Sequence, residues 1–173
     1  MPAITAFDVS IDLFLRGLRS LKGMLAKAYS HRTDATEVAA KVPENVTFNV
    51  QCCVNLAIGG LGLLTATQQE SPVWSNDDKS LEKVIASVDQ TIALLEGGAK
   101  PADLDDVEGR TLEVTYGNGQ TAMWGGREYI LGYGIPNFMF HLCMVYSNLQ
   151  SHGVEVGKMD YLLPFMAGMA PNP

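Results

Sequence analysis

The sequence predicts a mainly α-helical four-helix bundle with one small β-hairpin before the last helix. Two stretches, 7–28 and 81–95, repeat apolar residues at the three- and four-residue steps of one helix face. Residues 111–124 alternate instead at period two around a Gly-Asn-Gly turn, which is typical of a hairpin. Because two strands alone are barely stable, we expect the hairpin to pack against the helices. The 173 residues fit a single domain, 1–173, with an irregular tail at 163–173.

The first two helices are expected over residues 8–31 and 47–67. Thr47 is the expected N-cap of the second helix. This helix lies in a run without charge between Glu44 and Glu70, which is long enough to cross a bilayer. Asparagine, glutamine and glycine residues interrupt the run, so we expect a helix that is buried on nearly all sides within the bundle.

The third helix follows a capping signal, Ser75 with Asp78 three residues later. The glycine pair at 97–98 would close it in the left-handed conformation that glycine tolerates. An acidic linker then leads to the hairpin. The last helix is expected over 126–152, where Pro136 predicts either a kink or a break.

Composition and motifs exclude several classes of function. The net charge is −7 and no cluster of basic residues occurs, since Arg16, Arg19, Lys22 and Lys27 are expected to form one solvated face of the first helix. Nucleic acid and anionic membranes are therefore disfavoured partners. Cys52, Cys53 and Cys143 have neither the spacing of a metal site nor an even number for disulfides. No secretory signal is visible, and we expect a cytoplasmic location. No phosphate-binding glycine loop, nucleophile elbow or His-Glu-x-x-His motif occurs.

Five short motifs lie along the chain: Phe-Leu-Arg-Gly-Leu at 14–18, Gly-Arg-Thr-Leu at 109–112, Pro-Asn-Phe-Met-Phe-His at 136–141, Leu-Gln-Ser-His-Gly-Val at 149–154 and Asp-Tyr-Leu at 160–162. Together they resemble the DinB-like superfamily, in a branch known only as a domain of unknown function. The resemblance implies a four-helix bundle, often a homodimer, with a cavity that holds a divalent metal in many relatives. Relatives with known activities include thiol-dependent transferases and isomerases.

The resemblance also implies three histidine ligands, one in the second helix and a His-x-x-x-His pair in the last. Here the pair is Asn137 and His141, and the second helix offers only Gln51, Cys52, Cys53 and Asn55 in that region. Asparagine offers a neutral oxygen, which binds transition metals poorly. We therefore expect no tightly bound metal cofactor; if a metal is bound, His141 and Cys52 are its expected ligands.

His141 has two interpretations, a hydrogen-bonded core histidine or a site residue. Gln51 and Asn55 lie one turn apart on the second helix and need partners, because an unpaired buried amide costs about 1–3 kcal/mol. They would pair with Asn137 and His141 in a structural polar network, or line a ligand-binding pocket with them.

Tyr133, Asn137 and His141 step by four residues along one face of the last helix. In this row His141 would carry a proton and Tyr133 would donate one, so both are candidate catalytic residues. Aromatic residues at helical spacing are also typical of a core or of a dimer contact.

The leading hypothesis is a homodimer that binds a small, fairly apolar molecule in a bundle pocket around His141, without the usual metal. One alternative is an enzyme, an isomerase, lyase or hydrolase, that uses His141 as general acid or base or as the ligand of a divalent metal. A second alternative is a structural dimerisation protein.

Overall fold

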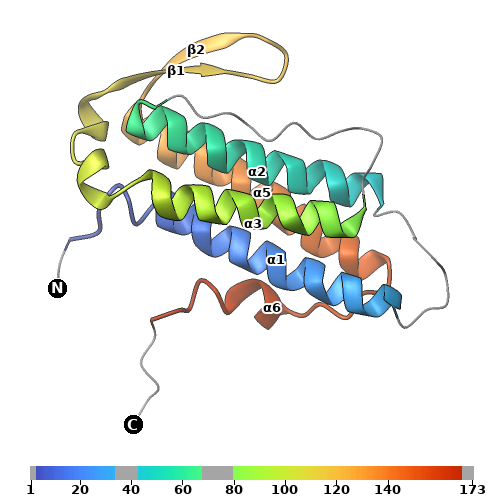
Figure 1. Cartoon of the computed structure of the whole chain (residues 1–173). Helices are drawn as coiled ribbons and strands as arrows, with labels where there is room; N and C mark the ends of the chain where they lie inside the picture. Colours follow the sequence, from blue (N-terminus) through green and yellow to red (C-terminus); the bar gives the residue numbers. More distant parts are fainter. Residues whose placement is uncertain (1–2, 34–42, 68–79, 169–173) are drawn as a thin grey trace.

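Four long helices pack around one core in the computed structural model of the chain (Figure 1), which describes residues 3–33, 43–67 and 80–168. The long helices are α1 (Ile11–Thr33), α2 (Glu44–Thr65), α3 (Leu81–Gly98) and α5 (Ile135–Ser151). Both α1 and α2 pack against α3 and against α5, so the four helices form a closed bundle. The prediction of a mainly helical bundle with a hairpin before the last helix is confirmed.

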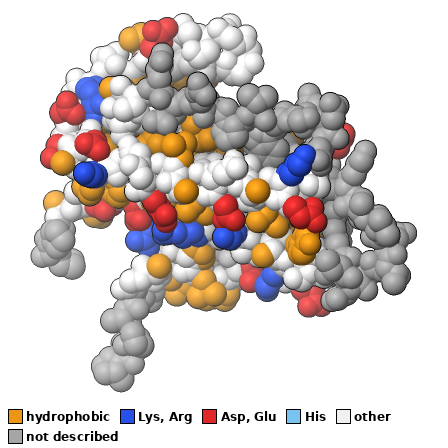
Figure 2. Space-filling model, viewed as in Figure 1, with side chains coloured by type: hydrophobic (Ala, Val, Ile, Leu, Met, Phe, Trp, Pro, Cys, Tyr) orange, Lys and Arg blue, Asp and Glu red, His pale blue; other side chains and the backbone are white. Residues whose placement is uncertain are grey.

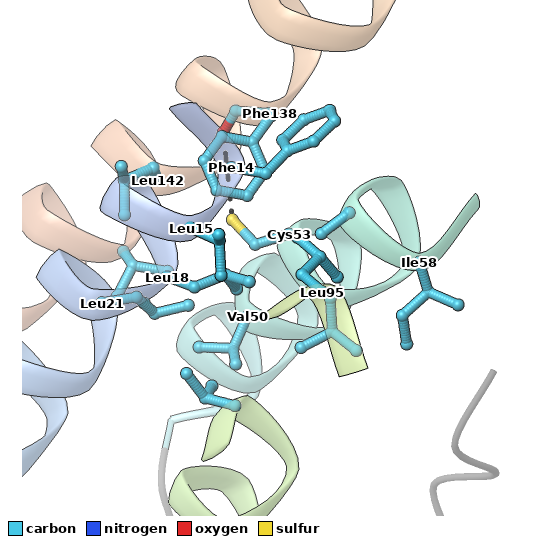
Figure 3. Close-up of a cluster of buried hydrophobic side chains, with 14 of the residues drawn as sticks. Phe14, Leu15, Leu18, Leu21, Val50, Cys53, Ile58, Leu95, Phe138 and Leu142 are labelled. Carbon is cyan, nitrogen blue, oxygen red and sulfur yellow. Dashed lines mark hydrogen bonds between the residues drawn. The ribbon is translucent and has the colours of Figure 1, made fainter. Parts of the chain in front are cut away.

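The core is built on an aromatic pair that joins α1 to α5. Phe14 and Phe138 are both buried and meet edge to face, with ring centroids 5.0 Å apart. Cys53 of α2 lies beside this pair, with its Sγ 3.9 Å from the carbonyl oxygen of Phe138 (Figure 3). Such a pair contributes roughly 0.5–1.5 kcal/mol beyond the area that it buries. The pair therefore helps to set how α5 lies against α1 and α2.

The start of α2 differs from the predicted one. The helix begins at Glu44, with Pro43 at the N-cap position, and not behind Thr47. The carbonyl oxygen of Pro43 accepts hydrogen bonds from the backbone N–H groups of Val46 and Thr47. Proline suits this position because its φ is preset and the missing N–H would have no helical partner. Thr47 therefore lies inside the first turn and does not cap the helix.

The start of α3 is capped by Ser80, whose Oγ accepts a hydrogen bond from the backbone N–H of Lys83. The predicted signal at Ser75 and Asp78 lies outside the described residues. The helix does end at Gly98, but the next residue is extended, so the predicted left-handed cap is wrong. Gly98 instead allows close packing, because a Cβ there would lie 2.8 Å from a methyl group of Leu61 in α2.

The hairpin consists of β1 (Thr111–Thr115) and β2 (Thr121–Gly125), paired antiparallel with Leu112 opposite Trp124. Two short 3-10 turns, η1 (Pro101–Leu104) and η2 (Val107–Gly109), occupy the acidic linker before it. Arg110 ties the hairpin to the bundle, because its guanidinium donates a 2.7 Å hydrogen bond to the carbonyl oxygen of Leu64 near the end of α2. A cation is favourable at a helix C-terminus.

The predicted last helix is one continuous helical run in three parts, α4 (Gly126–Tyr129), a π-helical segment η3 (Ile130–Gly134) and α5. Pro136 does not break it. The ring of a proline crowds the carbonyl group four residues earlier, and proline has no N–H to bond with it. The wider π turn just before Pro136, in which the N–H of Ile135 bonds to the carbonyl of Ile130, accommodates this residue.

After α5 the chain returns along α1 and forms a short helix that the sequence did not predict, α6 (Lys158–Leu162). Residues 163–168 are turns. Arg16 of α1 holds them by donating to the carbonyl oxygens of Phe165 and Ala167, at 2.9 and 3.0 Å. The described part of the tail thus packs on its own chain.

Charged side chains and uncharged helices occupy different sides of the bundle. Ion pairs join α1 to α3, Arg19 to Glu96 and Lys22 to Asp89, and a row of charges crosses the face seen in Figure 2. By contrast, α2 and α5 contain a single charged residue, Glu44.

One helix among the described residues, α2, is long and apolar enough to cross a membrane by length and composition. Because 56% of its most apolar window is buried inside the bundle, α2 has the character of a core helix. It is less enclosed than predicted, since Phe48 and Asn55 are exposed on its outer side.

Candidate functional site

His141 lies on the side of α5 that faces α2, where the two helices meet at the surface. Its imidazole is partly exposed and touches two phenylalanine rings edge to face, Phe48 of α2 at a centroid distance of 6.1 Å and Phe140 of α5 at 5.2 Å. These two rings are unusually open to solvent, at 61% and 59% exposure. A polar ring in contact with two exposed apolar rings is a combination suited to binding a small molecule.

Asn49 of α2 is a buried hydrogen-bond partner of the imidazole. It is only 6% exposed, and its Nδ2 donates a 2.6 Å hydrogen bond to the carbonyl oxygen of Asn45. Its Oδ1 lies 2.8 Å from Nδ1 of His141. Since an amide oxygen can only accept, Nδ1 of His141 must carry the hydrogen of this bond. The neutral ring then keeps a free lone pair on Nε2.

The protonation state of His141 follows from its position. Partial burial lowers the pKa of His141 below its ordinary value, because the charged form loses solvation there. At neutral pH the ring is therefore uncharged. Its Nε2 can accept a hydrogen bond, take up a proton or ligate a cation.

The polar contact continues toward the start of α2. The Nδ2 of Asn45 donates a 2.8 Å hydrogen bond to Oδ1 of Asn148 on α5. The Nδ2 of Asn148 is buried and has no hydrogen-bond partner within the described part of the chain. Four polar side chains thus form a seam between the two helices, and we call this the α2–α5 seam: Asn45, Asn49, His141 and Asn148.

Three predicted partners of His141 are placed differently. Gln51 follows Asn49 by two positions, which turns it about 200° around α2 and away from the seam. Asn55 is exposed, and Asn137 is partly exposed one turn before His141. Across the described ranges, no hydrogen bond joins Gln51, Asn55 or Asn137 to His141. A polar network does exist, but Asn45, Asn49 and Asn148 form it; ligand binding by Gln51, Asn55 and Asn137 stays a prediction.

Tyr133 packs away from the seam, under the hairpin. Its ring contacts those of Tyr116, Trp124 and Tyr129 at centroid distances of 5.4, 5.9 and 6.0 Å. The indole Nε1 of Trp124 donates a 2.8 Å hydrogen bond to the hydroxyl of Tyr116. Eight residues of helix separate Tyr133 from His141, roughly 12 Å. The structure therefore does not bring this candidate proton donor to His141.

The three cysteines are free thiols in different surroundings. Cys52 is partly buried and Cys53 fully buried, and burial raises the pKa of both thiols. Cys143 is exposed, with its Sγ 3.6 Å from the hydroxyl of Tyr161. Within residues 3–33, 43–67 and 80–168, no three His, Cys, Asp or Glu side chains come together as a metal site. The pairing of His141 with Cys52 as ligands stays a prediction.

Two hollows lined by described residues lie away from His141. One, of about 430 Å³, is open to solvent and lies between the end of α1 and the segment after α5, with Lys27, His31 and Glu155 in its lining. The other, of about 200 Å³, includes Ile4, Leu131 and other apolar side chains. The seam is instead a surface feature between two helices.

Asn49 and Phe48 were not predicted as site residues. A signal for Asn49 was present, because it shares a helix face with the core residues Val46 and Cys53 at three- and four-residue steps. An amide on such a face needs a partner. Phe48 had no such signal, because a single exposed aromatic residue is common on protein surfaces.

The comparisons with known proteins bear on the fold. The profile of the family described as a domain of unknown function, DUF1993, matches residues 6–162. The crystal structure of a DinB family member protein from Shewanella denitrificans superposes with a TM-score of 0.73 at 24% sequence identity, covering 96% of this chain and 94% of that chain. No curated protein matches the chain significantly. The resemblance seen in the short motifs is confirmed, and the likeness to the crystal structure shows the fold.

Proposed function

The chain belongs to the DUF1993 family and has a DinB-like fold, and from this premise we propose that it binds a small, fairly apolar molecule at the α2–α5 seam. The imidazole of His141 supplies the polar contact of this site. Phe48 and Phe140, whose rings contact the imidazole, supply apolar area beside it. The site lies at the surface where two helices meet, and this differs from the enclosed pocket expected from sequence.

A single observation carries the proposal: a neutral, anchored histidine contacts two phenylalanine rings that are each about three-fifths exposed, at 61% and 59%. Ligand sites combine mostly apolar walls with a few well-placed polar groups. Leaving two phenylalanine rings in water gives up the stabilisation that burial would bring, roughly 1.5–3 kcal/mol for a whole side chain. A ligand that covers the two rings recovers part of this stabilisation.

The enzyme alternative has support of its own. A histidine with one ring nitrogen held by an amide and the other carrying a lone pair is arranged as a general base. Binding precedes any such reaction, so the same test addresses both functions. Homodimer formation, the structural dimerisation alternative and the cytoplasmic location all stay predictions.

The proposal is tested by thermal unfolding with a panel of small molecules that includes phenol, benzyl alcohol, indole and cyclohexanol. A binder at roughly ten times its Kd should raise the Tm of the wild type by about 3–5 °C. His141→Ala should abolish the rise. His152→Ala is the matched control, because His152 is exposed at the end of α5. A rise of equal size in His141→Ala would place binding elsewhere and overturn the proposal.

A further inference from the structure

The contact between Asn49 and His141 has a chemical consequence for the ligand. We propose that Asn49 is a positioning residue that holds neutral His141 in the Nδ1–H tautomer, so that Nε2 selects ligands carrying an O–H or N–H donor beside an apolar group. The ligand half of this inference rests on the proposed function, whereas the tautomer is a property of the free protein.

The orientation of the Asn49 amide is set by its second contact. Its Nδ2 lies 2.6 Å from the carbonyl oxygen of Asn45, which can only accept. Turning the amide over would bring its oxygen against that carbonyl oxygen and its NH₂ group against Nδ1 of His141. The observed orientation satisfies both ends of the amide, so the oxygen faces the ring.

This orientation reverses the usual preference of histidine. In water the neutral side chain carries its hydrogen mainly on Nε2. Here the hydrogen on Nδ1 gains an acceptor that is 6% exposed and that water replaces poorly. The tautomer of a histidine is commonly set by the hydrogen bond that its other nitrogen makes. Nε2 therefore has a lone pair and no hydrogen.

The surroundings of Nε2 define the ligand class. No hydrogen bond reaches Nε2 from any residue that the structure describes. The neighbouring rings of Phe48 and Phe140 present carbon and hydrogen only. Their planes make angles of 75° and 79° with the plane of the imidazole. A ligand that fits must place a donor on Nε2 and an apolar group over these rings. Alcohols, phenols and azoles with an N–H group meet both conditions.

The tautomer is tested first, on the free full-length protein. Long-range ¹H–¹⁵N correlation spectra at neutral pH distinguish the ring nitrogen that carries hydrogen from the one that does not. The chain has three histidines, so His→Gln variants assign His31, His141 and His152. The wild type should show His141 as Nδ1–H. Asn49→Leu removes the acceptor and should shift His141 toward Nε2–H.

The ligand class is tested by the affinities of phenol and anisole. Both have the aromatic ring and its oxygen, but anisole has a methyl group in place of the O–H hydrogen and so has no donor. The wild type should bind phenol roughly two- to tenfold more tightly than anisole, the range expected of one neutral hydrogen bond. In Asn49→Leu the ratio of the two affinities should fall toward one. Nε2 then carries a hydrogen, and the oxygen of phenol and the oxygen of anisole can both accept it. Gln90→Leu, an exposed amide on α3, is the control and should keep the wild-type preference.

The outcomes separate this inference from the function on which it rests. An Nε2–H pattern in the wild type, or an unchanged Nδ1–H pattern in a folded Asn49→Leu, would overturn the role of Asn49. An equal affinity for phenol and anisole in the wild type would overturn the donor selectivity alone. If neither molecule binds, the ligand half fails together with the proposed function, and the ring-nitrogen spectra still decide the tautomer.

Discussion

The amide oxygen of Asn49 lies 2.8 Å from Nδ1 of His141 and joins α2 to α5. The two residues are 92 positions apart in the chain. This contact gives a partly exposed histidine a buried partner. It makes the α2–α5 seam an ordered feature of the bundle and leaves the outer edge of the ring available.

The stability of the protein should fall with acidification because of His141. Burial lowers its pKa in the folded state, whereas the unfolded chain has an ordinary pKa near 6.5. As the pH falls through about 6.5, the unfolded chain takes up a proton at this position before the folded protein does, so unfolding is favoured. Urea unfolding midpoints from about pH 8 to about pH 5 measure the effect. His141→Gln should flatten this curve; parallel curves for wild type and His141→Gln would contradict the assignment.

Much of the fold followed from the sequence, because helix periodicity and the hairpin turn are local signals. The partners within the seam did not. Asn49 pairs with a residue far along the chain, and only the antiparallel packing of α2 on α5 brings the two together. The π-helical segment before Pro136 was also missed, since proline alone predicts a disturbance without its form. Tyr133 was placed in one row with His141 by four-residue steps, but eight residues of helix separate the two by roughly 12 Å, and the ring of Tyr133 packs under the hairpin.

Two glycines of α1 should respond in opposite ways to alanine. A Cβ on Gly17 would overlap the ring of Phe138, which is fully buried against Phe14 and has little room to move. Gly17→Ala should therefore cost about 1–3 kcal/mol. A Cβ on Gly23 meets nothing within 4 Å, so Gly23→Ala should add up to about 1 kcal/mol through helix propensity. Urea denaturation measures both, and a stabilised Gly17→Ala would contradict the packing of α1 on α5.

The three thiols should react at very different rates with a disulfide reagent. Cys143 is exposed and should react first. Cys52 should be slower, because burial raises its pKa and only the thiolate attacks. Cys53 should react only on unfolding, since its side chain is inaccessible. Absorbance kinetics with the three Cys→Ser variants assign the phases; a fast phase that survives in Cys143→Ser would show that Cys52 or Cys53 is open to solvent.

Metal content is the remaining question about His141. We expect less than one equivalent of zinc, nickel, iron or manganese in protein purified without a chelator or a metal-binding tag. The content should be the same in wild type and in His141→Ala, because Asn137 is a poor ligand for such ions. Elemental analysis of the two proteins together measures this. One equivalent that is lost in the variant would mean that His141 ligates a metal.

The location of ligand binding is the most direct test of the proposed site. Amide ¹H–¹⁵N spectra of the wild type, titrated with phenol, report which backbone groups sense the bound molecule. We predict shifts centred on residues 48–52 of α2 and 137–144 of α5, absent in His141→Ala. Shifts centred on the hollow around Ile4 and Leu131, or on the one beside Lys27 and His31, would contradict binding at the seam.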